Sequence, residues 1–128
     1  MAKILMAEDE KQIADMIAFK LTNSGHQVIR AQDGEQAMLL AKRDTPDLIM
    51  LDAMMPGIGG FEVLRRLKAD PALRSVPVIM VTAKGHERDV LSGLRGGAVD
   101  YVVKPFSLKE LAARVELALG KERPPTTP

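Results

Sequence analysis

Polar residues that could act together in phosphoryl chemistry follow short apolar segments of the sequence. These residues are Glu8, Asp9, Asp52, Thr82 and Lys104. Grouped carboxylates repel one another unless a cation lies among them, and oxygen ligands without histidine or cysteine favour Mg²⁺, Mn²⁺ or Ca²⁺. Two or three carboxylates with remaining water ligands suit Mg²⁺, which often binds beside phosphate oxygens. If the apolar segments lie side by side, the polar residues that follow them therefore predict a site that binds Mg²⁺ and phosphate.

Asp52 is the best candidate for a nucleophile in such a site. Its place is central, with Glu8 and Asp9 on one side and Thr82 and Lys104 on the other. The lysine would supply a positive charge for a phosphoryl oxygen, and the threonine a hydroxyl donor. The predicted chemistry is attack of the Asp52 carboxylate on phosphorus, which yields an aspartyl phosphate.

Each residue taken singly has a plainer interpretation. Asp9 would cap a helix that begins near Glu10, Asp52 would be a loop residue, and Thr82 an ordinary helix cap. Lys104 would be a surface lysine at a turn. The functional interpretation is favoured because all of them stand at the ends of inner strands.

Five apolar runs alternate with helical patterns and are expected to form the sheet that positions these residues. The runs are Ile4–Ala7, Val28–Ala31, Leu48–Leu51, Val78–Val81 and Tyr101–Val103. Near-continuous apolar strands are typical of a parallel sheet covered on both faces, while the more polar second run suits an edge. Five β–α units predict an α/β fold with a doubly wound, flavodoxin-like sheet in the order 2-1-3-4-5. All carboxyl ends then share one edge of the sheet.

The helical patterns include two with recognisable starts. Asp33 with Gln36, and Ser107 with Glu110, resemble capping boxes. The expected inner face of the first helix is Ile13, Met16, Ile17 and Leu21, and that of the fifth is Leu108, Leu111, Ala112, Val115 and Ala118. The remaining expectations concern packing: Met50, Met54, Met55 and Met80 in the core or loops, and His26 and His86 at the surface, since neither histidine has ligand spacing.

Composition indicates one domain and excludes several classes of protein. The 128 residues suit a single domain at residues 1–120, followed by a Pro/Thr-rich tail or linker at 121–128. A net charge of +1 argues against a free-standing nucleic-acid or membrane-surface binder, and the absence of cysteine excludes a disulfide framework. Without a signal-peptide pattern or a membrane-length apolar run, a soluble cytoplasmic protein is expected.

Motifs in a fixed order give the sequence from Lys3 to Leu119 a close resemblance to response-regulator receiver domains of two-component signalling. The motifs are Ile4–Glu10, Pro46–Asp52, Met55–Gly57, Pro77–Lys84 and Asp100–Phe106. The resemblance implies that Asp52 accepts a phosphoryl group from a histidine kinase, a phosphotransfer protein or a small donor. It also implies that the chain is a signalling switch rather than an enzyme. Such a switch catalyses only its own phosphotransfer and autodephosphorylation.

The resemblance further assigns the metal site. Asp9 would bind Mg²⁺ directly, and Glu8 mainly through water. Asp52 and the backbone carbonyl of Met54 would complete the protein ligands.

The same resemblance predicts how the state of the site reaches the surface. Lys104 would contact the phosphoryl group, and its bond to Pro105 would be cis. Thr82 and Tyr101 would form the switch pair and alter the face made by the fourth helix, fifth strand and fifth helix. A homodimer through that face is left open, with salt bridges from Asp100, Glu110 and Arg114. The kinase, the signal and the output are not indicated by the sequence.

Some positions depart from the family pattern or vary within it. Gly59 stands where an aspartate is usual, and Val99 where an acid is frequent. Met54 and Lys84 occupy the positions that govern water attack on the aspartyl phosphate, and Met54 has no polar group to orient water. Slow self-dephosphorylation is therefore expected.

Two other functions compete with this interpretation. A haloacid-dehalogenase-like phosphatase also uses a nucleophilic aspartate and Mg²⁺, but it needs a second aspartate where this chain has Met54, and it tends to need a cap domain. A pseudo-receiver would act only as a binding module, and the intact set of polar residues argues against it.

Overall fold

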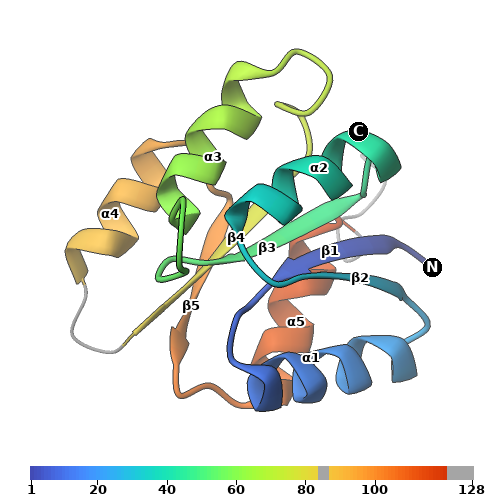
Figure 1. Ribbon diagram of the computed structural model, residues 1–128. Helices are drawn as coiled ribbons and strands as arrows, with labels where there is room; N and C mark the ends of the chain where they lie inside the picture. Colours follow the sequence, from blue (N-terminus) through green and yellow to red (C-terminus); the bar gives the residue numbers. More distant parts are fainter. Residues whose placement is uncertain (84–86, 121–128) are drawn as a thin grey trace, which may run out of the picture.

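The computed structural model describes residues 1–83 and 87–120, in which strands and helices alternate (Figure 1). The strands are β1 (Lys3–Ala7), β2 (Gln27–Ala31), β3 (Leu48–Asp52), β4 (Val78–Ala83) and β5 (Asp100–Lys104). The helices are α1 (Lys11–Asn23), α2 (Gly34–Asp44), α3 (Gly60–Ala69), α4 (Glu87–Arg95) and α5 (Leu108–Ala118). The expectations for Lys84, His86 and the tail at 121–128 concern residues outside the described ranges.

The strands form a parallel sheet in the order β2-β1-β3-β4-β5, which confirms the predicted topology. Figure 1 shows α1 and α5 on one face of the sheet and α2, α3 and α4 on the other. Because β1 and β3 are neighbours with Ala7 opposite Leu51, the residues that follow on each strand emerge at one edge. This edge is where the direction of winding reverses and where open α/β sheets bind ligands.

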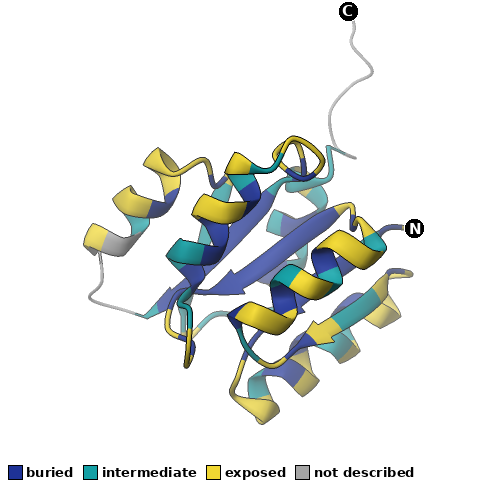
Figure 2. Cartoon of the chain, turned by 45° about the horizontal axis from the view of Figure 1, so that its top comes forward, coloured by how far each residue is buried: buried dark blue, intermediate teal, exposed yellow. Residues whose placement is uncertain are grey.

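The central strands are the most deeply buried part of the chain (Figure 2). Successive side chains of β3 point to opposite faces. Ile49 and Leu51 pack with α2 and α3, whereas Leu48 and Met50 pack with α1 and α5. With apolar cores on both faces, the ends of these strands have little freedom to move.

The predicted helix starts at Asp33 and Ser107 are confirmed, but neither capping box is complete, since Gln36 Oε1 accepts from Gln32 N at 2.7 Å rather than from Asp33 N. Asp33 Oδ1 accepts a hydrogen bond from Gln36 N at 2.8 Å, and Ser107 Oγ accepts one from Glu110 N at 2.9 Å. The Glu110 carboxylate, however, pairs with Arg114 at 3.2 Å. A guanidinium within reach one turn later attracts the carboxylate away from the helix start.

His26 is buried, so the expectation of a surface residue is wrong. Its Nδ1 accepts a hydrogen bond from Ala2 N at 3.1 Å, and its Nε2 lies 2.6 Å from Glu116 Oε2. Because Nδ1 is an acceptor, the neutral ring carries its proton on Nε2 and donates to the carboxylate. The histidine thereby joins the start of β1 and the segment before β2 to α5.

The expected inner face of α1 is partly wrong. Ala14, Ile17 and Leu21 are its buried residues, while the side chain of Met16 is 49% exposed. The helix is rotated so that a small residue lies against the sheet. Periodicity counted from large apolar residues alone does not detect this rotation.

Gly60 lets the start of α3 approach the chain that follows Asp52. A Cβ at this position would meet the carbonyl oxygen of Asp52 and lie 2.9 Å from Ala53 Cα. Gly60 N also donates a hydrogen bond to Ala53 O at 3.2 Å. The close contact is between backbones, so a flexible side chain cannot relieve it.

We therefore expect Gly60→Ala to destabilise the protein by about 2 kcal/mol, the usual range for overpacking against a fixed structure. Gly59→Ala is the matched control, because its Cβ would lie an ordinary 3.5 Å from Ala53 O. Urea unfolding followed by circular dichroism measures both variants. Equal unfolding free energies would show that α3 can shift without cost.

Candidate functional site

The structure brings most of the predicted site residues together at the carboxyl ends of the strands. Glu8, Asp52 and Thr82 are buried polar residues, and the Lys104 side chain is mostly covered. The strand register explains the grouping, since Asp52 lies opposite Val81 in β4. The apolar strands thus carry polar side chains to one edge of the sheet, where Glu8, Asp52 and Thr82 are themselves shielded from water.

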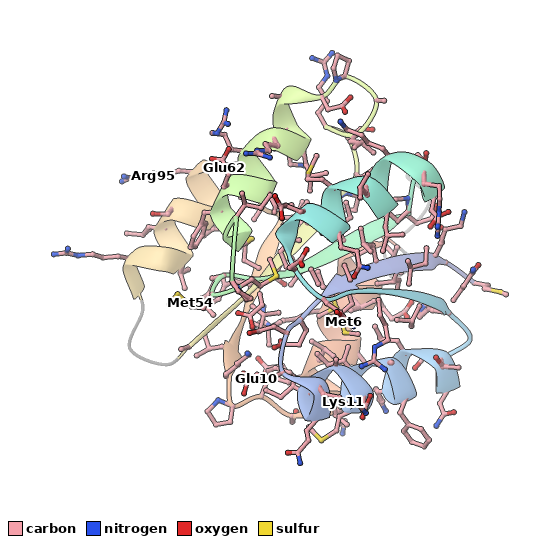
Figure 3. All side chains as sticks on the ribbon, viewed as in Figure 1. Met6, Glu10, Lys11, Met54, Glu62 and Arg95 are labelled. Carbon is pink, nitrogen blue, oxygen red and sulfur yellow. The ribbon has the colours of Figure 1, made fainter. Side chains whose placement is uncertain are left out.

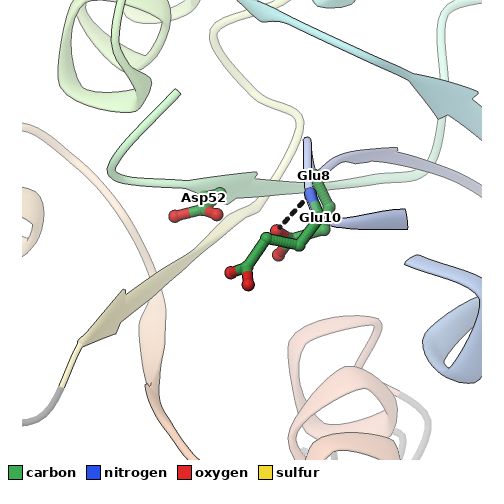
Figure 4. A group of neighbouring side chains, drawn as sticks. All are labelled: Glu8, Glu10 and Asp52. Carbon is green, nitrogen blue, oxygen red and sulfur yellow. Dashed lines mark hydrogen bonds between the residues drawn. The ribbon is translucent and has the colours of Figure 1, made fainter. Parts of the chain in front are cut away.

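The ammonium group of Lys104 holds the carboxylates of the site together. Its Nζ lies 2.9 Å from Asp52 Oδ2, 2.9 Å from Glu10 Oε1 and 3.3 Å from Glu8 Oε2. Figure 4 shows these carboxylates, with Asp52 at the end of β3 and the two glutamates beyond β1. Oxygens of Glu8, Glu10 and Asp52 all lie within 4.8 Å of one another, so they could hold a metal ion.

The concentration of negative charge shifts the ionisation of the site. Burial, followed by a hydrogen bond and charge repulsion from Asp52, raises the pKa of Glu8 from 4.5 to about 7. Burial alone would lower the pKa of Lys104, but its bonds to Glu10 and Asp52 raise it above the usual value. The Lys104 ammonium does not fully neutralise the negative charge of the carboxylates. The charge that remains favours the binding of a divalent cation.

Asp9 lies apart from this cluster. It is exposed and lines, with Glu8, a surface hollow of about 450 Å³ that extends toward β2. Its interpretation as the helix cap is wrong, because α1 begins at Lys11 with Glu10 in the N-cap position. Glu10 itself was not among the residues singled out from the sequence, and nothing in its spacing distinguishes it from an ordinary acid at a helix start.

The Asp52 carboxylate is also fixed from the loop that follows β3. Met54 N donates a hydrogen bond to Asp52 Oδ1 at 3.0 Å. Met54, whose position is labelled in Figure 3, is an exposed residue, with 63% of its surface accessible. Thr82 Oγ1 is buried without a hydrogen-bond partner among the described residues. A buried hydroxyl without a partner is available to donate a hydrogen bond to a ligand. The Lys104–Pro105 peptide bond is cis.

Tyr101 lies in β5, which pairs with the strand that carries Thr82. It is half-buried, and the Arg114 guanidinium lies over its ring at 5.9 Å. Arg114 also pairs with Asp100 at 2.8 Å. Tyr101 and Arg114 border a hollow of about 480 Å³ on the surface of β5 and α5, and Lys104 borders it too.

A doubly wound sheet with buried acids and a lysine at the carboxyl ends of its strands defines an α/β domain with a polar ligand site at that edge. The model of the response regulator receiver domain family matches residues 4–116. The chain therefore belongs to the response regulator receiver domain family.

Curated relatives agree with this membership. The chain is 42% identical over 122 residues to the phosphate regulon transcriptional regulatory protein PhoB of Escherichia coli, and these residues are 95% of this chain and 53% of PhoB. It is 44% identical over 119 residues to the alkaline phosphatase synthesis transcriptional regulatory protein PhoP of Bacillus subtilis, or 93% of this chain and 49% of PhoP. The chain spans about half the length of these relatives.

Solved structures show the same fold. A putative response regulator from Chloroflexus aurantiacus matches with a TM-score of 0.90 and 33% identity, over 93% of this chain and 98% of that one. The receiver domain of Francisella response regulator 1452 matches with a TM-score of 0.87 and 33% identity, over 96% of this chain and 100% of that one. Membership of this family is consistent with a phosphorylation-based signalling switch, and it does not favour the phosphatase and binding-module alternatives. No helix in the described ranges is long and apolar enough to cross a membrane.

The raised pKa of Glu8 predicts a pH dependence of stability in metal-free protein. The folded state keeps the Glu8 proton up to about pH 7, whereas the unfolded chain releases it near 4.5. The unfolding free energy should therefore fall as pH rises from 4.5 to 7, by roughly 1–3 kcal/mol from this group.

Denaturant unfolding of wild type and Glu8→Gln across this pH range measures the effect, since the variant lacks the titrating group. The difference between the two curves isolates Glu8 from other groups that titrate. Curves that stay parallel would contradict the assignment.

Proposed function

We propose that Asp52 is the phosphoacceptor of this receiver domain. The supporting observation is the ion pair of 2.9 Å between Asp52 Oδ2 and Lys104 Nζ in a buried setting. In the proposed step an Asp52 oxygen forms a bond to phosphorus while the bond from phosphorus to the donor breaks, and the donor leaves with the electron pair. Lys104 then neutralises a phosphoryl oxygen, and the free hydroxyl of Thr82 donates to another.

We propose Glu8, Asp9, Asp52 and the Met54 carbonyl as the Mg²⁺ ligands. The clustered carboxylates and the raised pKa of Glu8 support a cation at this edge. When bound, Mg²⁺ would neutralise charge on the transferred group. Asp9 lies outside the cluster but borders the same hollow as Glu8, so it is close to the proposed site.

The switch is proposed to run from Thr82 to Tyr101 and the surface of α4, β5 and α5. Motion of Thr82 toward a phosphoryl oxygen would vacate space beside β5 for the Tyr101 ring, which Arg114 now covers. A homodimer through this face would have to exchange existing pairs, because Arg114 bonds Asp100 and Glu110 within one chain. Dimer formation and the motion of Tyr101 would thus both change the contacts of the Arg114 guanidinium.

The domain is proposed to span residues 1–120, with a tail or linker at 121–128, and to work in the cytoplasm. Its proposed partners are a histidine kinase or phosphotransfer protein and an output that this chain does not identify. PhoB and PhoP are named as transcriptional regulators and are about twice as long, which supports transcription as the process controlled. The net charge of +1 supports regulation of such an output without direct nucleic-acid or membrane binding by this domain.

Acetyl phosphate with Mg²⁺ should phosphorylate Asp52. We expect the intact mass to rise by one phosphoryl group in wild type and not in Asp52→Asn, because an amide is a poor nucleophile. Mass spectrometry without acid treatment detects the labile adduct. Equal labelling of the asparagine variant would refute Asp52 as the acceptor.

The Met54 side chain is expected to slow hydrolysis of the aspartyl phosphate. It stands exposed beside Asp52 and has no group to orient a water molecule, while Lys84 lies outside the described residues. Met54→Asn should speed dephosphorylation by about three- to tenfold, because water placement dominates such reactions.

Decay of phosphorylated protein after removal of the donor gives the rate, and Met54→Leu serves as an apolar control of similar size. If wild type decays at least as fast as Met54→Asn, the side chain at position 54 is not the brake.

A further inference from the structure

Glu10 occupies a helix start but does not cap it. It stands at the N-cap position of α1, where its side chain makes no capping hydrogen bond. Its counterparts Asp33 and Ser107 both bond the backbone of their own helices. The Glu10 carboxylate instead reaches Lys104 Nζ at 2.9 Å, a contact between residues 94 positions apart in the sequence. The Glu10 carboxylate therefore interacts with Lys104 in the site and does not cap α1.

The partners of Lys104 differ in how easily they can leave. The Glu8 and Asp52 side chains are only 2% and 6% exposed, whereas that of Glu10 is 60% exposed. A buried carboxylate that loses its cation stays unpaired in a poorly solvated place, but an exposed one is rehydrated. Glu10 is thus the partner that Lys104 can release at low cost.

Glu10 is also held at its backbone, apart from the bond of its own side chain to Lys104, and its carbonyl oxygen accepts a hydrogen bond from Ala14 N at 2.9 Å. Its N–H donates to Glu8 Oε2 at 3.2 Å, as drawn in Figure 4. Release of the side chain therefore leaves the start of α1 in place. A rotation of the Glu10 side chain is sufficient, and no movement of the helix is required.

We propose that Glu10 is a positioning residue that holds the Lys104 ammonium in the resting state and gives it up to an incoming phosphoryl anion. The proposal rests on phosphorylation of Asp52 as the function of the site. A phosphoryl group on Asp52 would add negative charge within a few ångströms of Glu10, as the 4.8 Å spread of the carboxylate oxygens requires. Like charges at that separation repel, while Lys104 gains a stronger anion. Glu10 therefore competes with the phosphoryl group for one cation and lowers the affinity of the site for anions.

The test compares Glu10→Gln with Glu35→Gln, which removes the same charge from an exposed position in the first turn of α2. Beryllium fluoride with Mg²⁺, an anionic mimic of the phosphoryl group, is titrated against each protein and followed by amide NMR shifts. We expect Glu10→Gln to bind it about three- to tenfold more tightly than wild type, and Glu35→Gln to stay within about twofold. Unchanged affinity in Glu10→Gln, or an equal gain in both variants, would overturn the proposal.

Titration with Mg²⁺ alone separates this role from metal ligation. We expect Glu10→Gln to bind Mg²⁺ within about threefold of wild type, and Asp9→Ala to lose most of its affinity. A loss in Glu10→Gln as severe as that in Asp9→Ala would make Glu10 a metal ligand and overturn the positioning role.

A final measurement distinguishes failure of this inference from failure of the proposed function. If wild type takes no phosphoryl group on Asp52, the function fails and the proposal falls with it. If wild type is phosphorylated, the side-chain NMR signals of Lys104 in the metal-free protein decide the contact: they should shift in Glu10→Gln and not in Glu35→Gln. Unshifted signals would show that Glu10 does not hold the lysine.

Discussion

The ammonium group of Lys104 is the interaction on which the rest of the site depends. Glu8 and Asp52 are buried with carboxylate oxygens within 4.8 Å of each other, and two carboxylates so placed do not both ionise readily without a cation. Lys104 lies between them but does not fully compensate their charge, as the pKa of about 7 for Glu8 indicates. The remaining negative charge of the site can therefore be neutralised either by protonation of a carboxylate or by binding of a cation.

This balance requires a rigid frame, and the sheet provides it. Charges held close together would separate if the strand ends could move, but β1, β3 and β4 are packed by apolar side chains on both faces. The contact of Gly60 with the chain after Asp52 adds a restraint from α3. Folding free energy from the apolar core thus opposes the electrostatic repulsion at the edge of the sheet.

The sequence predicts what depends on local pattern and misses what depends on distant partners. Alternating apolar runs predict the topology, and the topology in turn predicts that Asp52, Thr82 and Lys104 meet. His26 was misjudged because its partners, Ala2 and Glu116, are 24 and 90 residues away. Glu10 was missed for the same reason: its sequence neighbours suggest a helix start, and only the folded chain places Lys104 beside it.

Some residues at this edge are buried and others are exposed. This difference suggests how the rates of the proposed phosphorylation and dephosphorylation can vary while the reaction stays the same. Glu8, Asp52 and Thr82 are enclosed by the strands, so replacing them leaves buried groups unpaired or the core disrupted. Glu10 and Met54 border the same carboxylate from the solvent side, and their side chains contribute little to the core. Substitutions at exposed positions usually change stability only slightly. If Asp52 is phosphorylated as proposed, entry of the phosphoryl group and attack by water would therefore be tuned from these positions, while the buried residues would carry out the reaction itself.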